Sequence, residues 1–161
     1  MNRFLLLFLA AISLVSCESN IVFSETRAMD GEWGADEVVE FKLPQLDSLK
    51  SYDLFVNIRN NNEYKFNNLF LILSMNFPHG KTITDTIEYR MANPDGSWMG
   101  QGIGNVKENK LLYKQSVSFL EEGIYSIDIA QAMRNNGNVE GVTKLEGITD
   151  VGFSVEETTK Q

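Results

Sequence analysis

Hydrophobic and polar residues alternate with a period of two through most of residues 38–155. Because successive side chains of a strand point to opposite faces of a sheet, short alternating runs predict half-buried β-strands. Residues 39–43 and 52–58 are the clearest such runs, and Pro44 ends the first of them. This part of the chain is therefore predicted to be built from strands.

Further strands are predicted over residues 69–77, 81–90, 111–119, 125–129 and 148–155. Residues 69–77 are apolar at both alternating sets of positions, which predicts a central strand covered on both sides. Residues 131–134 are instead predicted to form a short helical turn. About seven short strands separated by turn signals indicate a single all-β domain, an antiparallel β-sandwich that is either Ig-like or jelly-roll-like.

Gly123-Ile124-Tyr125 opens one of these predicted strands. This spacing resembles the corner tyrosine of β-sandwiches, whose hydroxyl bonds nearby backbone. We therefore expect a structural role for the hydroxyl of Tyr125. Ile127 lies where an immunoglobulin domain would carry its second cysteine.

The N-terminus has a different pattern. A positive Asn2-Arg3 pair precedes residues 4–15, an apolar run too short to span a bilayer as a permanent helix. Leu14-Val15-Ser16-Cys17 then resembles the lipobox of bacterial lipoproteins, whose cysteine accepts a lipid such as palmitate. The alternatives are an ordinary signal peptide or a buried structural cysteine. The lipobox predicts a signal peptide at 1–16 and a lipidated tether at 17–34. The strand pattern predicts a β-sandwich at 35–157, followed by a polar tail at 158–161.

The composition excludes some classes of binding partner. Cys17 is the single cysteine, and the formal net charge is −8 at pH 7. An acidic chain is a poor ligand for nucleic acid and gains no electrostatic attraction to anionic lipid. The membrane contact expected here is therefore the N-terminal lipid anchor, and no nucleic acid partner is expected.

The segment 93–104 lacks the alternation of apolar and polar residues that is typical of strands. Asn93-Pro94-Asp95-Gly96 is typical of a type I turn, Trp98 follows, and Gly100 and Gly102 alternate with other residues beyond it. We expect a loop over residues 91–110, which is longer than a simple connection needs and is thus a candidate interaction loop. Trp98 is either a recognition aromatic or a lid over the core. We expect the lid for Trp98 and a partner contact at Pro94, Asp95 and Gly96.

Residues with catalytic potential are few. His79 is the single histidine and lies in a Pro-His-Gly turn, which rules out a histidine-rich metal site and predicts a solvated side chain. The adjacent pairs Glu121-Glu122 and Glu156-Glu157 would point to opposite faces of a strand. Asp85, Glu88 and Asp95 offer oxygen atoms, but no EF-hand loop is present. We therefore expect no enzyme activity, no metal site and no cofactor.

Several segments together resemble the gliding-motility lipoprotein GldH family of Bacteroidetes. They are the lipobox, residues 52–60, Tyr64, Asn68-Leu69, residues 85–89, 95–102, 123–125, 131–134 and 147–152. The most distinctive are the runs Asp-Gly-Ser-Trp-Met-Gly-Gln-Gly and Gln-Ala-Met-Arg.

The resemblance implies a non-enzymatic accessory or scaffold lipoprotein of the cell envelope, needed for gliding and tied to the type IX secretion machinery, with protein partners in that apparatus. Glu18-Ser19-Asn20 lacks the charged run that sends some lipoproteins of this type to the cell surface, which favours the outer membrane facing the periplasm. The alternative is a module that binds glycan or peptidoglycan through exposed aromatics, for which Phe55 and Trp98 are the candidates.

Overall fold

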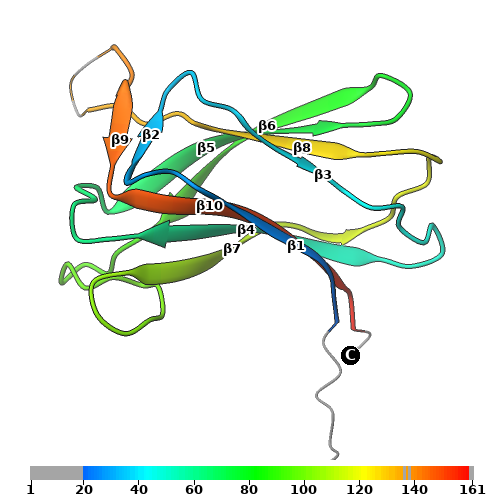
Figure 1. Ribbon diagram of the computed structural model, residues 1–161, viewed down its shortest axis with the longest axis horizontal. Coiled ribbons are helices and arrows are strands. Elements are labelled where there is room, and N and C mark those ends of the chain that lie inside the picture. The colour runs from blue at the N-terminus through cyan, green and yellow to red at the C-terminus, as the bar shows by residue number, and fades with distance from the viewer. Residues whose placement is uncertain (1–19, 136, 138, 160–161) are drawn as a thin grey trace, which may run out of the picture.

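The computed structural model describes residues 20–135, 137 and 139–159. In this part of the chain, ten strands form two four-stranded sheets and one two-stranded ribbon, and every pairing is antiparallel. The two larger sheets lie face to face as a β-sandwich (Figure 1). The predicted all-β antiparallel sandwich is thereby confirmed. The predicted signal peptide at 1–16 and Cys17 lie outside the described residues.

Each large sheet combines strands that are distant in the sequence. The first has the order β1 (Ile21–Ala28), β10 (Ile148–Glu157), β4 (Tyr52–Asn60) and β7 (Lys107–Val117). The second has the order β3 (Val39–Lys42), β8 (Ser126–Gln131), β5 (Asn68–Asn76) and β6 (Thr82–Arg90). The ribbon pairs β2 (Glu32–Gly34) with β9 (Lys144–Glu146).

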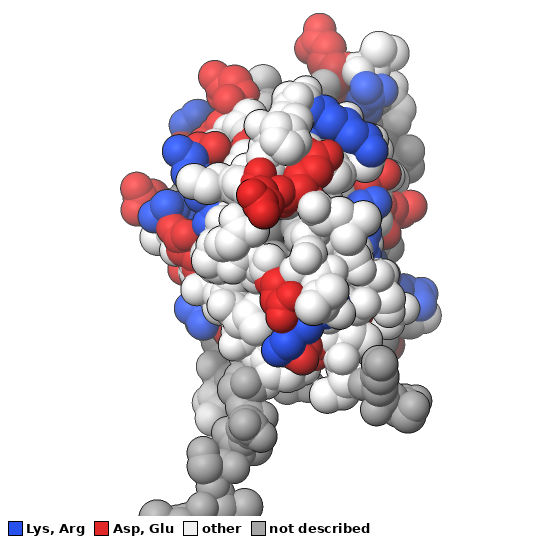
Figure 2. Space-filling view, turned by 90° about the vertical axis from the view of Figure 1, so that its right-hand side faces the viewer, with Lys and Arg blue, Asp and Glu red and all other residues white. Residues whose placement is uncertain are grey.

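The strand register defines two ends of the sandwich. Ile21 pairs with Glu156, and Tyr52 pairs with both Glu157 and Val117. We call this the terminal end, because the described chain begins and finishes there (Figure 1), and Figure 2 looks at it face on. At the other end, which we call the loop end, Asn60 pairs with Lys107 and Ile148. The nine residues of β4 separate the two ends by roughly 26 Å.

The core fills the space between the two sheets. Alternate residues of β4 and β10 meet alternate residues of β5 and β8, and they are fully buried: Leu54, Val56, Ile58, Val151, Phe153, Val155, Leu69, Leu71, Leu73, Ile127 and Ile129. Burying each such side chain contributes about 1.5–3 kcal/mol, so the period of two determines which face each strand turns inward. Trp33 of the ribbon is also fully buried, and its indole N–H donates to the carbonyl oxygen of Glu37 at 2.9 Å.

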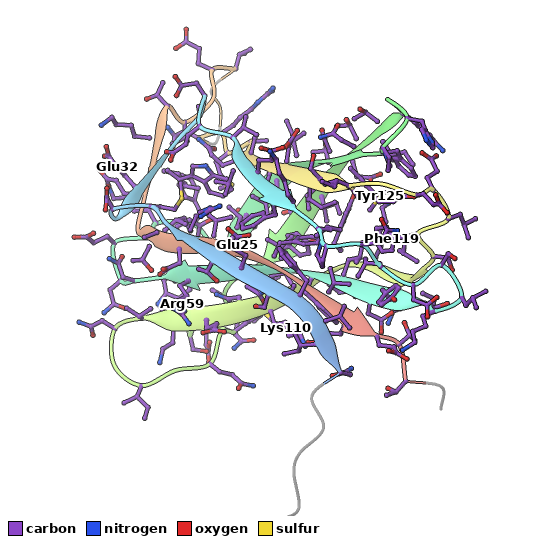
Figure 3. All side chains as sticks on the ribbon, turned by 45° about the vertical axis from the view of Figure 1, so that its right-hand side comes forward. Glu25, Glu32, Arg59, Lys110, Phe119 and Tyr125 are labelled. Atoms are coloured by element: carbon purple, nitrogen blue, oxygen red, sulfur yellow. The ribbon has the colours of Figure 1, made fainter. Side chains whose placement is uncertain are left out.

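Tyr125 forms the corner contact expected from its sequence position. Its hydroxyl oxygen accepts the backbone N–H of Glu121 at 3.0 Å, in the loop just before β8. Its ring packs edge-on against Phe119 (Figure 3), with centroids 4.8 Å apart. The Tyr125 centroid also lies 5.2 Å from that of Phe77. The hydroxyl thus fixes the path of the chain as it crosses from β7 in one sheet to β8 in the other.

Three local predictions need correction. Residues 21–28, which the sequence assigns to a tether, form β1 and pair with β10. The outer face of β5 is not fully covered, since Phe70 is half-buried and Ile72 is exposed. Residues 131–134 do not form a helical turn, because Gln131 ends β8 and the N–H of Ala132 donates to the carbonyl of Phe70 at 2.9 Å.

Candidate interaction loop

The candidate loop connects β6 to β7, and thus an edge strand of one sheet to an edge strand of the other. It spans residues 91–106 and lies at the loop end, where β7 begins beside Asn60. The predicted range of 91–110 is too long, because residues 107–110 already pair with β4. Met91 is fully buried, and its N–H donates to the carbonyl of Asn67 at 2.8 Å, so the start of the loop is fixed to the domain.

Residues 93–97 form a turn that we call the proline turn. The N–H of Gly96 donates to the carbonyl of Asn93 at 2.9 Å, and Asn93 N–H donates to the carbonyl of Ser97 at 2.8 Å. Gly96 has a φ of 84°, as the last residue of a three-residue hairpin loop requires. The sequence therefore locates this turn correctly, and Pro94 and Asp95 at its tip are exposed.

The Asp95 carboxylate is used within the proline turn. Its Oδ1 accepts the Ser97 N–H at 2.9 Å and the Ser97 hydroxyl at 2.6 Å. These two hydrogen bonds from Ser97 lower the pKa of Asp95, since they favour the charged carboxylate. The turn is thus held in one shape while its surface stays accessible.

Trp98 follows the proline turn and is half-buried. It forms an isolated antiparallel bridge with Ala92 and packs against the hydrophobic core. Its ring centroid lies 6.0 Å from that of Tyr64, which is buried and donates its hydroxyl to the carbonyl of Asn68 at 2.6 Å. Trp98 therefore occupies the position expected of a lid over this edge of the core, with part of its ring exposed.

Residues 101–108 form a second turn that we call the glycine hairpin. Gln101 and Glu108 exchange backbone hydrogen bonds of 2.8 and 2.7 Å, and Gly102 has a φ of 145°. A Cβ atom on Gly102 would lie 2.6 Å from the carbonyl oxygen of Val106. At Gly100, just before the hairpin, a Cβ atom would lie 2.7 Å from Oδ1 of Asn109. The two glycines allow the loop to lie close against the start of β7.

The loop also exposes apolar side chains that the sequence reading did not single out. Ile103, at the tip of the glycine hairpin, has an exposed fraction of 103%, and Met99 and Val106 of the same loop are also exposed. The available signal was Gly102-Ile103-Gly104, a large apolar side chain between two glycines. A residue so placed has no strand face to pack on.

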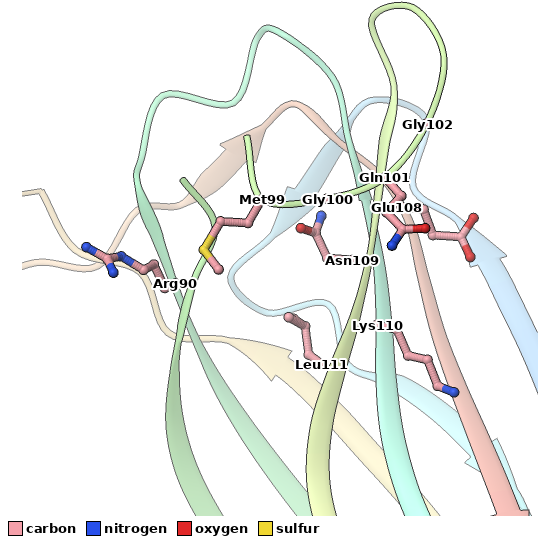
Figure 4. A pocket seen from close by; sticks show the side chains of 9 residues that line it. All are labelled: Arg90, Met99, Gly100, Gln101, Gly102, Glu108, Asn109, Lys110 and Leu111. Atoms are coloured by element: carbon pink, nitrogen blue, oxygen red, sulfur yellow. The ribbon is translucent and has the colours of Figure 1, made fainter. Parts of the chain in front are cut away.

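A shallow cavity of about 720 Å³ lies under the glycine hairpin (Figure 4). Its lining mixes basic, acidic, amide and apolar side chains, among them Arg90, Lys110, Glu108, Gln101, Asn109, Met99 and Leu111. The floor is rigid, because the buried Asn109 amide donates to the carbonyl of Ile58 at 3.2 Å and to Asn60 Oδ1 at 2.9 Å. Such a cavity can accept both polar and apolar groups of a peptide.

The remaining candidates for chemistry have structural partners. His79 is exposed as expected, but its Nδ1 lies 3.0 Å from a carboxylate oxygen of Glu121, so it is not a solitary side chain. Asp85 binds Lys114 at 2.7 Å and accepts the Tyr113 hydroxyl at 2.9 Å; the Lys114 contact is the main cause of the lowered pKa of Asp85. Among the described residues, no three His, Cys, Asp or Glu side chains are grouped to hold a metal ion.

The fold and this loop define a small antiparallel β-sandwich module with an exposed, internally braced connection at one end. A family model described as "GldH lipoprotein" matches residues 21–155, and the chain belongs to this family. Among the described residues, no helix has the length and apolar character needed to cross a membrane.

Two relatives carry matching names. The chain is 53% identical over 152 residues to the "Gliding motility lipoprotein GldH" of Flavobacterium johnsoniae, covering 94% of each chain. It is also 53% identical over 143 residues to the "Gliding motility lipoprotein GldH homolog" of Christiangramia forsetii, covering 89% of this chain and 88% of the relative. No solved structure matches the chain.

Proposed function

We propose that this chain is a non-enzymatic, lipid-anchored accessory protein of the cell envelope that supports gliding motility. The proposed anchor is Cys17, and the proposed task is to hold a protein partner through the β6–β7 loop. In its finer form, the proposal assigns that partner to the gliding and type IX secretion machinery and the protein to the outer membrane, facing the periplasm. The names of the two relatives and the lipobox support the coarser part.

The observation that carries the docking role is the strand register. Cys17 precedes Ile21 by four residues, and Ile21 lies at the terminal end of the sandwich. The β6–β7 loop enters β7 at Lys107, at the loop end, roughly 26 Å away along β4. An anchor at Cys17 therefore leaves the proline turn and the glycine hairpin pointing away from the lipid.

The chemistry of the loop favours a protein partner. Met99 and Ile103 are both exposed, and Met99 lines a cavity that also contains Arg90. Methionine and arginine are enriched in protein interfaces, where a few residues supply most of the binding energy. The internal bonds of the proline turn reduce the entropy that the loop would lose on docking.

Glycan binding is less well supported by the two candidate aromatics. Trp98 packs partly against the core, and the Phe55 ring has the Lys110 ammonium group 4.2 Å from its centroid. Neither ring is presented as an open stacking platform of the kind that sugars use. The non-enzymatic part of the proposal is supported by Asp85 and Asp95, which are engaged in local structural contacts.

The test compares two exposed apolar residues. Ile103→Ser removes the exposed apolar side chain at the tip of the glycine hairpin. Val139→Ser is the matched control, since Val139 is 88% exposed in another segment. Ile103→Ser should weaken capture of envelope partners about 30-fold, the equivalent of 2 kcal/mol for an interface anchor, and should impair complementation of a gliding-deficient deletion strain. Equal capture and equal gliding with both variants would remove the loop from the proposal.

A further inference from the structure

Three large apolar side chains are exposed at the terminal end. Leu49 is 94% exposed, Leu120 is 75% exposed and Ile124 is 65% exposed. Leu49 lies between β3 and β4, whereas Leu120 and Ile124 lie between β7 and β8. Isolated exposed apolar residues are common, but three at one end of a small domain need an explanation.

The two loops that carry these residues are held next to each other. The N–H of Gly123 donates to the side-chain oxygen of Gln45 at 3.2 Å. The rings of Tyr52 and Phe119 lie 5.8 Å apart, and the Tyr52 hydroxyl accepts the N–H of Asp47 at 3.0 Å. The three apolar side chains therefore project from one braced surface.

This surface adjoins the point where the chain leaves the domain. Lys50 binds Glu157 at 2.7 Å, and the N–H of Thr158 donates to the carbonyl of Ser51 at 2.8 Å. Asn20 accepts the N–H of Glu157 on its carbonyl oxygen at 2.8 Å. Leu49 is the immediate neighbour of Lys50, so it lies beside both chain termini of the described part.

The length of chain before β1 limits the distance to a lipid on Cys17. Four residue steps separate Cys17 from Ile21, and a fully extended chain covers at most about 14 Å over that length. The headgroup region of one leaflet is itself roughly 5–8 Å thick. A lipid on Cys17 therefore holds the terminal end close to the bilayer surface.

The charged side chains at the terminal end do not provide an electrostatic attraction to the bilayer. The loops at this end carry four acidic and three basic side chains, and four of these seven form two pairs, Lys50 with Glu157 and His79 with Glu121. The others are Asp47, Glu122 and Lys81. Figure 2 shows acidic and basic side chains scattered over a largely uncharged surface. A contact with lipid here depends on the apolar side chains, since a surface with this acidic excess gains nothing from anionic headgroups.

We infer that the terminal end is a membrane-contact surface, on which Leu49, Leu120 and Ile124 enter the headgroup boundary of the bilayer that holds the lipid anchor. The inference rests on the lipid anchor of the proposed function and adds an orientation to it. Apolar side chains that enter the interface add to the affinity supplied by acyl chains. With the terminal end on the bilayer, the domain stands upright and presents the β6–β7 loop on its far side.

The test uses the full-length acylated protein in vesicles of phosphatidylethanolamine and phosphatidylglycerol. Cys17 is the single cysteine and is blocked by lipid, so Leu120→Cys, Ile124→Cys and Leu49→Cys each introduce one reactive thiol for an environment-sensitive fluorophore. Ile103→Cys, at the fully exposed tip of the glycine hairpin, is the matched control. Lipids with brominated acyl chains then quench fluorophores that reach the interface, and flotation of the vesicles reports anchoring.

The expected result is loss of most of the emission from the labels at 49, 120 and 124, with no quenching of the label at 103. Vesicle-bound protein with unquenched labels at 120 and 124 would overturn the membrane contact and leave the anchor intact. Equal quenching at 103 and 120 would overturn the upright orientation. Failure of the acylated protein to float with the vesicles would overturn the anchor and this inference together.

Discussion

The backbone N–H of Glu121 donates to the hydroxyl oxygen of Tyr125 at 3.0 Å, so one side chain closes the turn between β7 and β8. Tyr125→Phe should therefore lower the free energy of unfolding by about 1–3 kcal/mol, because it leaves that N–H without its partner while the ring contacts remain. Denaturant unfolding of the described domain measures this loss. Tyr89→Phe is the control, since its hydroxyl bonds the carbonyl of Leu112 at a more exposed site. Equal losses for the two variants would contradict a special role for the corner.

This corner was predictable because its signal is local: a glycine, one residue and a tyrosine before an alternating run. The core faces of β4 and β10 were predictable for a similar reason, since their apolar residues recur at every second position. In β4 the burial alternates in the same way, whereas in β10 Gly152 and Ser154, between the core residues, are buried as well. Strand β1 gave no such signal. Most of its side chains are exposed on both faces, and the backbone ladder to β10 that holds it in the sheet is not encoded in side-chain polarity.

Tertiary contacts overrode local preference at residues 131–134. Alanine, methionine and arginine favour helix, but the Gln131 side chain accepts the Met133 N–H at 2.9 Å and donates to the carbonyl of Val142 at 2.7 Å. The candidate loop was predictable from its proline and glycines, whereas the exposure of Ile103 was not, because polarity alone does not show which apolar residue lacks a neighbour.

Cys17→Ser should abolish lipid attachment and release the protein from the membrane fraction. Serine cannot replace the thiol that accepts the lipid, and two acyl chains are what makes anchoring stable. Incorporation of a labelled fatty acid together with detergent partitioning measures both effects. A serine variant that still takes up label and stays with membranes would show that another residue or segment holds the protein there.

Trp98→Ala should destabilise the domain by about 2 kcal/mol, less than the 3–5 kcal/mol typical of a fully buried aromatic, because its ring is only half-buried. Asp95→Ala should lower stability by less, since its two hydrogen bonds lie within an exposed turn. Thermal unfolding of both variants measures the packing role of each residue, and capture of envelope proteins by the same variants measures its role in binding a partner. If Trp98→Ala keeps full stability and loses its partners, Trp98 is an anchor and not a lid.

Gly100→Ala should cost about 1–3 kcal/mol, because its Cβ atom would lie 2.7 Å from Oδ1 of the buried Asn109 and 2.9 Å from the carbonyl oxygen of Glu108. Gly141→Ala provides the control: its nearest neighbour would be a carbonyl oxygen at 3.6 Å, an ordinary contact. Denaturant midpoints of the two variants give the comparison. A Gly100→Ala protein as stable as the control would mean that the start of β7 shifts to accommodate the added methyl group at little cost in free energy.

The domain should lose stability in alkaline solution. Burial raises the pKa of Tyr89 to about 12 and also raises the pKa of Tyr64 and Tyr113 above the ordinary value of about 10. The folded state therefore holds these protons more tightly than the unfolded state. Their stabilising effect is complete below pH ~10 and is lost as the pH rises through the folded-state values.

Unfolding free energies measured across this alkaline range, together with tyrosinate absorbance, test the expectation. Tyr89→Phe should make the free energy of unfolding fall less steeply with pH, because the variant lacks the hydroxyl proton of Tyr89. Tyrosinate absorbance that develops fully near pH 10 in the folded protein would contradict the burial argument.

The direction of β1 has a mechanical consequence. Its first residue, Ile21, lies at the terminal end and its last, Ala28, lies toward the loop end, with β10 antiparallel alongside it. If Cys17 carries the proposed lipid and the β6–β7 loop holds the proposed partner, a pull between them acts along this strand. The β1–β10 hydrogen bonds then bear the load in shear and share it. Peeling them open one by one would require a sideways pull. Under the proposed function, a strand that contributes little to the core would therefore transmit tension between the membrane and the partner.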